Sequence, residues 1–496
     1  MPFILFDCDL PPFGAMVTIW TKWTKCHFRA FLVTIAAFLD ALAGLLPAAA
    51  IVSDADTIAP WLTDWRGRWS GVGSVLLQPS TTDEVAAIVE AAEAHGVALV
   101  PQGGNSSMVG GATPPADGSA VLLSLRRMNR IRSIGSDHAV VEAGVILETL
   151  QRAAEAEGAR FPLDLGARGS ATVGGLASTN AGGTQVLRFG TMRAQVLGME
   201  AVLSGGLVHD SLSGLKKDNR GFSLDHLLIG AEGTLGIVTA LRLRLVPGRV
   251  QRAAAWIGLD DPHQALALLR RLDAAGDRIE AFELIPDASL QRVLRHIPQT
   301  RAPLAGSWPW HVLVEAVTGA GEDPPERLLE QLLSDAPIGD AVIAQSDAHT
   351  EALWRIRHSI SEAERTDGPA AQHDISLPID HVPVFLTEEA RLIEQHFPGT
   401  EATGYGHLGD GNVHFHVRAP AGAPRDWADG AKGKAVSALV HDLVTEAGGS
   451  ISAEHGIGQM KKDELARLAS PARMQALRAI KRAMDPHGIF NPGKLV

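Results

Sequence analysis

The sequence predicts an α+β fold with two domains, the first of which binds a nucleotide. The chain has 496 residues, which is more than one hydrophobic core usually supports. Between residues 74 and 247, short apolar runs alternate with amphipathic segments, and glycine-rich stretches connect them, as in nucleotide-binding domains. Pro247-Gly248 then marks a boundary, and a second α+β region follows it.

Residues 1–52 are expected to form an extension that contains one amphipathic helix near residues 33–46. The stretch 28–52 is apolar, but Arg29 and Asp40 interrupt it, whereas a transmembrane helix needs about twenty apolar residues with few charges. No basic cluster leads into this stretch, so a secretory signal is also not favoured.

Composition and charge narrow the classes of partner. Apolar residues make up 46% and charged residues 20% of the chain, as in ordinary globular proteins. The net charge of -12 leaves no basic excess to neutralise phosphates, so nucleic acid is not an expected partner. The two cysteines, Cys8 and Cys26, lie outside every motif, which fits a reducing cytoplasm. A homodimer is compatible with this composition.

Residues 53–247 are expected to form the first domain. A capping signal at residues 79–84 precedes a run of apolar residues and predicts the start of a helix. Other apolar runs have the length and the flanking turns of strands. Strands are predicted at 97–101, 121–125, 138–143 and 239–246, and a further helix at 147–157.

Two glycine-rich segments, residues 101–107 and 166–183, suit the binding of a diphosphate. Glycine lets the backbone approach a ligand closely, and successive N–H groups in such loops form concavities that bind anions. The alternative is that both segments are tight turns without a ligand. Neither follows the G-x-G-x-x-G pattern of a Rossmann site, and the chain contains no G-x-x-x-x-G-K-[ST] loop for ATP.

Residues 248–455 are expected to form a second domain that binds the substrate, and residues 456–496 a C-terminal segment. Apolar periodicity predicts several helices and strands in the second domain, and its last strand carries a histidine-rich motif. The expected helices lie at 262–275, 325–334 and 353–365, and the expected strands at 310–316 and 341–345.

The segment GHLGDGNVHFH at 406–416, followed by SAEHG at 452–456, is the strongest candidate for an active site. A turn between His407 and His414 can bring the two imidazoles together, and Glu454 can add a third ligand. Catalytic zinc commonly takes three such ligands and keeps one position open. The alternative is that these are structural histidines.

Several motifs together resemble one family. PQGGN at 101–105, ATVGGLASTNAGG at 171–183 and GAEGTLGIVT at 230–239 look like the FAD-binding domain of the vanillyl-alcohol oxidase superfamily. With the two histidine motifs, the chain resembles the FAD-linked D-2-hydroxyacid dehydrogenases, which include D-lactate, glycolate and D-2-hydroxyglutarate dehydrogenases. The resemblance covers residues 53–496 and implies a two-domain fold whose C-terminal segment returns to the FAD domain.

The resemblance implies which residues bind FAD. Some members of the superfamily attach FAD covalently through a histidine in the first loop, where this chain has Asn105, so non-covalent FAD is expected. The implied contacts are Pro101, Gln102, Gly103, Gly104, Asn105, Ser106, Gly174, Gly175, Ser178, Asn180, Gly183, Glu232, Gly233, Ile237, Asn412 and Asn491.

The resemblance also implies the chemistry. His407, His414 and Glu454 match the metal ligands of the family, with zinc the expected metal, and His455 matches its catalytic base. The metal would stabilise the developing alkoxide of a small 2-hydroxy acid. His455 would accept the hydroxyl proton, and a hydride would pass from the substrate to flavin N5. The residues that match the substrate site are Arg357, Ser361, Gln372 and His416. Of these, Arg357 and Ser361 match the positions that bind the distal carboxylate in D-2-hydroxyglutarate dehydrogenases.

Two of these residues depart from the pattern of the family. Members often have lysine at the position of Gln372, and those that act on D-2-hydroxyglutarate often have asparagine at the position of His416. The expected substrate is therefore a D-2-hydroxy acid of the D-2-hydroxyglutarate or D-lactate class, with an electron-transfer flavoprotein or a quinone as acceptor. Two other readings stay open: a flavin oxidase that passes electrons to oxygen, and a zinc hydrolase with a nucleotide-binding domain.

Overall fold

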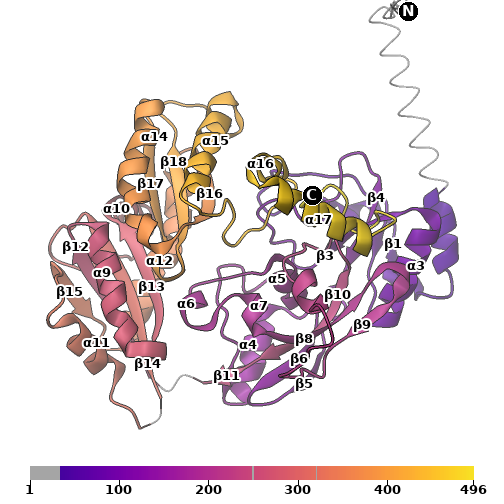
Figure 1. Ribbon diagram of the computed structural model, residues 1–496, viewed down its shortest axis with the longest axis horizontal. Helices are drawn as coiled ribbons and strands as arrows, with labels where there is room; N and C mark the ends of the chain where they lie inside the picture. Colours follow the sequence, from indigo (N-terminus) through magenta and orange to yellow (C-terminus); the bar gives the residue numbers. More distant parts are fainter. Residues whose placement is uncertain (1–33, 249–250, 320) are drawn as a thin grey trace, which may run out of the picture.

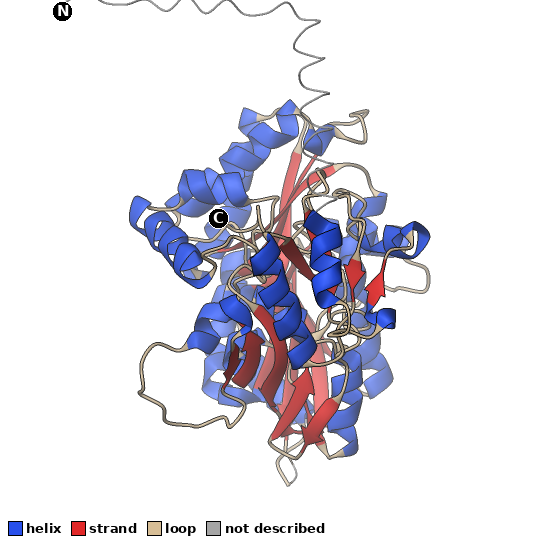
Figure 2. Ribbon diagram, turned by 90° about the vertical axis from the view of Figure 1, so that its right-hand side faces the viewer, coloured by secondary structure: helices blue, strands red, loops and turns tan. Residues whose placement is uncertain are grey.

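The computed structural model describes residues 34–248, 251–319 and 321–496, which fold into two bodies lying side by side (Figure 1). Both bodies combine sheets with helices packed against them (Figure 2), as the predicted α+β class requires. No helix in the described ranges is both long and apolar enough to cross a membrane. Cys8, Cys26 and the first residue of the expected N-terminal helix lie outside the described residues.

The first domain contains two main sheets and a short ribbon. One sheet has the order β1-β2-β4-β3, the other the order β5-β6-β10-β8-β9, and β11 pairs with β7. The strands are β1 (Ile51–Val52), β2 (Leu76–Leu77), β3 (Ala98–Gln102), β4 (Ala120–Ser124), β5 (Ile131–Ile134), β6 (His138–Glu142), β7 (Ala159–Arg160), β8 (Val196–Val202), β9 (Val208–Asp210), β10 (Ile237–Arg244) and β11 (Val246–Pro247).

Helices cover these sheets with their apolar faces. The helix predicted after residues 79–84 is α3, which begins after Thr81 because the Thr81 hydroxyl accepts a hydrogen bond from the N–H of Glu84. The main helices of this domain are α3 (Thr82–His95), α4 (Leu147–Ala156), α5 (Val173–Thr179), α6 (Val186–Phe189), α7 (Met192–Gln195) and α8 (Leu224–Leu228).

Part of the N-terminal extension packs into the first domain. Residues 34–42 are helical, and Phe38 and Leu42 are fully buried in the same apolar cluster as α3. Strand β1 also pairs with β2. The sheet of the first domain therefore includes residues before the boundary expected at residue 53, because these apolar side chains need the surface of the domain to leave water.

The second domain is built on one antiparallel sheet with the order β15-β12-β14-β13-β17-β18-β16. Helices α9, α11, α14 and α15 cover one face, and α10 and α12 cover the other. The strands are β12 (Gln251–Leu259), β13 (Ile279–Pro286), β14 (Trp310–Thr318), β15 (Asp340–Ile343), β16 (Ala370–Ser376), β17 (Glu401–His407) and β18 (Asn412–Arg418). The helices are α9 (Pro262–Leu272), α10 (Asp287–His296), α11 (Pro325–Leu333), α12 (Asp347–Thr366), α14 (Ala390–His396) and α15 (Ala431–Glu446).

Two local predictions need correction. The helix expected at 353–365 begins earlier, at Asp347, because Ser346 caps it by accepting a hydrogen bond from the N–H of His349. The glycine-rich segment 166–183 is not a continuous loop, since α5 occupies its middle. Thr172 caps α5 by accepting from the N–H of Gly175, and this capping outweighs the low helix propensity of glycine.

The C-terminal segment returns to the first domain, as expected. Its helices α16 (Lys462–Leu468) and α17 (Pro471–Met484) lie over that domain (Figure 1). The backbone around Phe490 pairs with β3, since the N–H of Leu99 donates to the carbonyl of Ile489 at 2.7 Å and the N–H of Asn491 donates to the carbonyl of Leu99 at 2.8 Å. The last residues of the chain thus extend a sheet that begins near residue 51.

A buried carboxylate joins the two domains. Glu280 of β13 is fully buried and forms ion pairs with Arg160 of β7 and Arg188 of α6. Both guanidinium groups also lie within 5.0 Å of the ring centroid of Phe189. One carboxylate of the second domain therefore holds two cations of the first, and this contact fixes how the domains face each other.

We expect Glu280→Ala to lower the free energy of unfolding by about 2–3 kcal/mol, because it removes a buried carboxylate that pairs with two partly buried cations. Equilibrium denaturation in urea measures the change. The control is Glu148→Ala, which removes an exposed pair with Arg152 and should cost less than about 1 kcal/mol. Equal losses in the two variants would contradict the role given to Glu280.

Candidate active site

The strand register gathers the polar side chains of the site on one face of the second sheet. In antiparallel strands, directly opposed residues share a face, and every second residue along a strand returns to it. His414 of β18 lies opposite Tyr405 of β17 and Asp374 of β16. The set aligned in this way comprises Glu283, Gln372, Asp374, Tyr405, His407, Asn412, His414 and His416.

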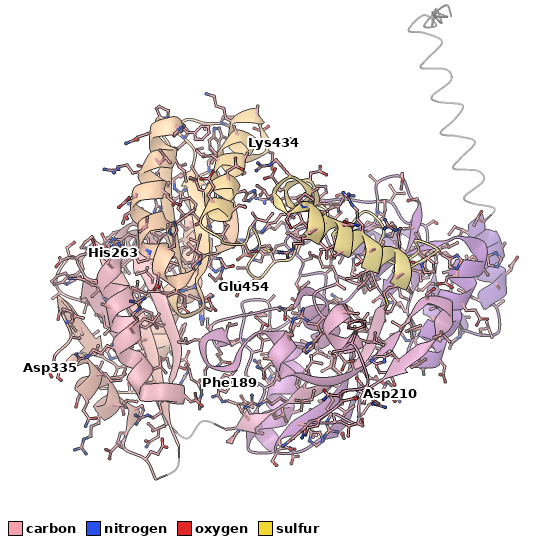
Figure 3. All side chains as sticks on the ribbon, in the orientation of Figure 1. Phe189, Asp210, His263, Asp335, Lys434 and Glu454 are labelled. Atoms are coloured by element: carbon pink, nitrogen blue, oxygen red, sulfur yellow. The ribbon has the colours of Figure 1, made fainter. Side chains whose placement is uncertain are left out.

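His407, His414 and Glu454 meet as the sequence predicts. One candidate ligand atom from each lies within 4.8 Å of the other two, and the two imidazole centroids are 5.7 Å apart. Glu454 comes from the C-terminal side of the chain and lies at the junction of the two bodies (Figure 3). Two nitrogen donors and one carboxylate suit a divalent cation such as Zn²⁺, which commonly takes three protein ligands in catalytic sites.

The charges in this cluster also favour a cation. Burial raises the pKa of the Glu454 carboxyl to about 7, although the charge of His407 opposes the rise. Burial moves the pKa of the His414 imidazole well below its usual value, so His414 is neutral and can act as a ligand. Burial would lower the pKa of the His407 imidazole, but the charge of Glu283 raises it to about 9, so a metal would bind here by displacing the proton of His407. A cation held by the three residues would also allow Glu454 to stay ionised, and the donor set therefore fits a metal.

Glu283 orients His407, and the sequence did not reveal it. Its Oε1 lies 2.6 Å from Nδ1 of His407, while its Oε2 accepts a hydrogen bond from Nε of Arg357 at 2.6 Å. The carboxyl is fully buried, and burial would raise its pKa, but the charges of Arg357 and His407 lower it to about 2. With Nδ1 held in this way, Nε2 of His407 faces Glu454 at 3.9 Å.

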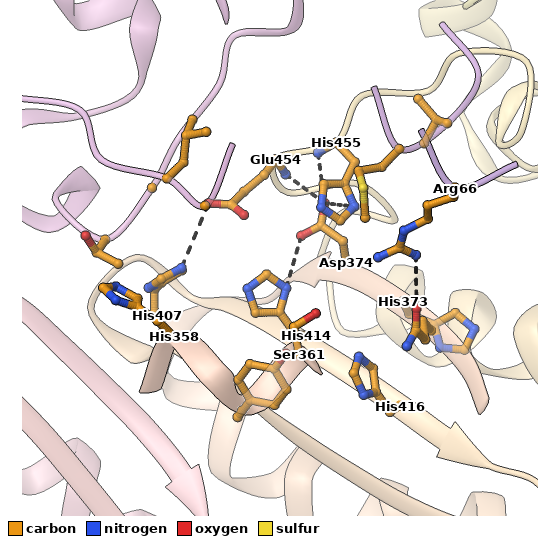
Figure 4. A pocket seen from close by; sticks show the side chains of 18 of the residues that line it. Arg66, His358, Ser361, His373, Asp374, His407, His414, His416, Glu454 and His455 are labelled. Carbon is orange, nitrogen blue, oxygen red and sulfur yellow. Dashed lines mark hydrogen bonds and ion pairs between the residues drawn. The ribbon is translucent and has the colours of Figure 1, made fainter. Parts of the chain in front are cut away.

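Asp374 is a second residue that sequence reasoning missed. Its Oδ2 accepts hydrogen bonds from the N–H groups of Glu454 and His455, both at 2.9 Å, and lies 3.3 Å from Nδ1 of His455. Its Oδ1 accepts from Nδ2 of Asn412 at 3.0 Å. Asp374 therefore positions both a candidate ligand and the candidate base (Figure 4). The available signal was a single carboxylate in the polar run Gln372-His373-Asp374, followed by Ile375.

His455 can act as a base in this setting. Burial lowers the pKa of its imidazole from the ordinary value, although the charge of Asp374 opposes the shift. The ring is therefore neutral near pH 7 and can accept a proton. Because Asp374 holds Nδ1, the second ring nitrogen is the one that remains for a substrate.

Two cavities meet at this base. The smaller, of about 490 Å³, contains the histidine cluster, and the larger, of about 810 Å³, is lined by the glycine-rich loops. Glu454 and His455 line both cavities, as does Ser361 of α12. The larger volume is typical of a cofactor site, so a cofactor in it would contact a ligand in the smaller one beside His455.

The first glycine-rich loop fits the diphosphate of a dinucleotide. Arg126 donates hydrogen bonds to the carbonyls of Gly103 and Gly104, each at 3.1 Å. In a trans peptide the N–H points opposite to the carbonyl, so the N–H groups of Gly104 and Asn105 point away from Arg126. Neither N–H donates to another described residue. Such free, converging N–H groups form an anion-binding concavity.

Ten of the sixteen residues implied for the cofactor line the larger cavity, and six do not. Three of these six have structural positions in the first domain. Gly174 packs directly against the backbone of Ala143. Asn180 has a positive φ of 50° and ends α5. Ile237 is buried in the core at the start of β10. The implied residues that line the cavity are Pro101, Gln102, Gly103, Gly104, Asn105, Ser106, Gly175, Ser178, Glu232 and Gly233.

Three further residues implied for the cofactor also lie elsewhere. Gly183 lines the smaller cavity. Asn412 is buried beside Asp374, and Asn491 donates to the carbonyls of Gly111 and Glu232. The Nδ2 groups of Asn412 and Asn491 hold the backbone behind the site. Their Oδ1 atoms are buried without a hydrogen-bond partner among the described residues.

The residues implied for the substrate line the smaller cavity together. Arg357 and Ser361 share one face of α12, and Gln372 and His416 are opposed on neighbouring strands. Nη2 of Arg357 is buried and has no hydrogen-bond partner among the described residues. A buried guanidinium with a free donor suits an anionic ligand, since an unpaired buried donor is costly.

Comparisons with known proteins agree with this geometry. Residues 73–211 match the family "FAD binding domain", and residues 250–495 match the family "FAD linked oxidases, C-terminal domain". The mitochondrial D-2-hydroxyglutarate dehydrogenase of Arabidopsis thaliana is 37% identical over 90% of this chain and 79% of its own. The D-2-hydroxyglutarate dehydrogenase of Xanthomonas citri pv. viticola is 36% identical over 91% of this chain and 95% of its own.

Solved structures share the fold. p-Cresol methylhydroxylase superimposes with a TM-score of 0.71 at 16% identity and covers 93% of this chain and 96% of its own. 4-Ethylphenol oxidase from Gulosibacter chungangensis gives a TM-score of 0.68 at 20% identity, over 93% of this chain and 97% of its own. The two-domain FAD-binding fold of the vanillyl-alcohol oxidase type is thereby confirmed.

We expect Arg126→Ala to weaken FAD binding about tenfold, because the loop N–H groups lose the contacts that orient them. Fluorescence quenching during titration of the apoprotein with FAD measures this. Arg127→Ala is the matched control, since Arg127 donates to the carbonyl of Gln78 instead. Equal weakening of FAD binding in Arg126→Ala and Arg127→Ala would contradict the role of Arg126.

Acid precipitation should leave the wild-type colour in the supernatant, as Asn105 offers no imidazole for covalent attachment. A yellow pellet would contradict non-covalent attachment.

Proposed function

This chain belongs to the family of FAD-linked D-2-hydroxyacid dehydrogenases, and from this premise we propose that it oxidises a D-2-hydroxy acid to the 2-oxo acid with the help of a divalent metal. The observation that supports the proposal most is that Glu454 and His455 line both cavities, while His407 and His414 lie beside Glu454 in the smaller one. A hydroxy acid bound at the cluster would have its reacting carbon beside the cofactor.

The protein side chains bind and deprotonate the substrate. Arg357 offers its free Nη2 to a carboxylate, and Ser361 lines the same cavity on the next turn of α12. His455 accepts the hydroxyl proton at the ring nitrogen that Asp374 leaves free. Asp374 then stabilises the imidazolium, because its carboxylate stays ionised close to the ring.

The metal and the cofactor complete this chemistry. His407, His414 and Glu454 would hold the cation, for which we propose Zn²⁺, and when bound it supplies a Lewis acid that stabilises negative charge on the hydroxyl oxygen. When bound, FAD supplies the hydride acceptor, N5, while Gly103 to Ser106 hold its diphosphate. Residues of α12 and of the segment 454–461 line the cavity that would hold the substrate.

The electron acceptor, the assembly and the location are also proposals. The similarity to relatives named as dehydrogenases supports an electron-transfer flavoprotein or a quinone rather than oxygen as the acceptor. Peroxide formation at the rate of substrate oxidation would instead favour the oxidase reading. We further propose a cytoplasmic enzyme, with a homodimer as one compatible assembly.

We expect His455→Asn to slow anaerobic reduction of the flavin by about 10²–10⁴-fold, because the hydroxyl proton loses its acceptor. Stopped-flow bleaching of the flavin by D-2-hydroxyglutarate or D-lactate measures the rate, and the absorbance spectrum checks that FAD remains bound. His358→Asn is the control, since His358 lines the same cavity and stacks on Trp354. An unchanged rate in His455→Asn would remove His455 as the base.

We expect Glu283→Gln to weaken metal binding about 10–100-fold, because the carboxylate that orients His407 is lost. Competition with a chelator, followed by metal analysis, measures the affinity. Glu315→Gln is the control, because Glu315 is another buried carboxylate of the same sheet and accepts a hydrogen bond from Trp354. Full flavin reduction in metal-free wild-type enzyme would contradict the metal assistance itself.

A further inference from the structure

Arg66 of the first domain reaches into the substrate cavity. It sits on a tight turn in which the N–H of Gly67 donates to the carbonyl of Asp64 at 2.9 Å and the N–H of Trp69 donates to the Asp64 carboxylate at 2.7 Å. Gly67 has a φ of 68°, which a side chain would rarely adopt. The turn is therefore well fixed, and Nη1 of Arg66 donates to Oε1 of Gln372 in the second domain at 3.0 Å.

The guanidinium of Arg66 forms no ion pair with another described residue, and its Nε is buried without a hydrogen-bond partner among them. Burial lowers its pKa to about 10, and the charges of Arg68 and Arg365 add to the effect, whereas Tyr405 and Asp64 oppose it. The ring of Trp65 lies 5.2 Å from the guanidinium carbon but leaves Nε unbonded. A part-buried cation with an unsatisfied donor is costly, so its surroundings fit a bound anion.

The position of Arg66 gives the distance of that anion from the reacting centre. Gln372 lies directly opposite His416, and Asp374 directly opposite His414. Two residues along a strand correspond to about 7 Å. The Arg66–Gln372 pair is therefore displaced by about one strand repeat from the metal-ligating His414. That spacing matches a second carboxylate separated by a short carbon chain from the hydroxyl-bearing end of the substrate.

We propose that Arg66 is a specificity-determining residue that binds the second carboxylate of a D-2-hydroxy dicarboxylate. The assignment rests on the proposed function of the same site. Arg66 acts across the junction between the domains, with Gln372 holding Nη1 and leaving the other donors of the guanidinium for the ligand. A monocarboxylate such as D-lactate has no group to place there, so the enzyme discriminates between substrates by this contact.

The test compares substrates that differ in the second carboxylate. Arg66→Gln should weaken D-2-hydroxyglutarate binding by about 10- to 100-fold, seen as a higher dissociation constant in anaerobic flavin bleaching with little change in the limiting rate. The values for D-lactate should change less than about threefold. The double variant Arg66→Gln/Gln372→Lys restores a cation from the second domain, on strand β16, and should recover most of the dicarboxylate affinity.

The control and a second measurement keep the outcome clear. Arg168→Gln removes a cavity arginine that already has Asp164 as its partner, and it should leave both substrates unaffected. Perturbation of the flavin spectrum by 2-oxoglutarate and by pyruvate reports binding without turnover, so it decides the assignment of Arg66 even if no hydroxy acid reduces the flavin. Loss of turnover in wild type alone would therefore sink the proposed function, not this assignment.

Two results would overturn the proposal. Equal weakening for D-lactate and D-2-hydroxyglutarate would mean that Arg66 serves the fold or the flavin, because it also lines the larger cavity. An Arg66→Gln variant that binds 2-oxoglutarate as tightly as wild type would show that the second carboxylate is held elsewhere.

Discussion

The site depends on one buried carboxylate, that of Asp374. Its two oxygens bind the backbone of residues 454 and 455 and the amide of Asn412, and one of them lies beside the ring of His455. Burial would raise its pKa, but the charges of His455 and Lys461 lower it far below the usual range. A segment with no regular secondary structure is thereby fixed against the sheet, and the candidate ligand Glu454 and the candidate base His455 obtain defined positions without a helix or strand of their own.

Other buried charges extend this arrangement. Glu283 joins Arg357 to His407, and Glu232 accepts hydrogen bonds from the N–H groups of Ile457 and Gly458 on the far side of the catalytic segment. Desolvation of such groups costs free energy, and a buried pair often stabilises no more than apolar packing would. We therefore infer that these contacts serve to orient the site residues. The apolar clusters on both faces of the sheet offset the free energy that desolvation of the charges costs.

The sequence predicted which candidate site residues come together, but not the residues that hold them in place. The turn between His407 and His414 is local, and the family motifs fixed Glu454 and His455. Glu283 lies on β13, which pairs with β17 although β14, β15, β16 and several helices lie between them in the chain, so only the strand order reveals it. Conversely, Asn180 and Gly174 belong to a cofactor motif but have structural roles. Asn180 ends α5, and Gly174 allows close packing against Ala143. A sequence motif can reflect such backbone requirements as well as contacts with a ligand.

The return of the C-terminal segment has a consequence for the order of assembly. Residues 451–461 carry the base, and the backbone at Ile489 and Asn491 must add to the edge of β3 before the first domain is complete. Because chains are made from the N-terminus and domains tend to fold as they emerge, both glycine-rich loops exist before the catalytic segment is synthesised. A chain truncated before residue 451 can present a partly built nucleotide cleft, but it lacks the candidate base and the strand that completes the first sheet.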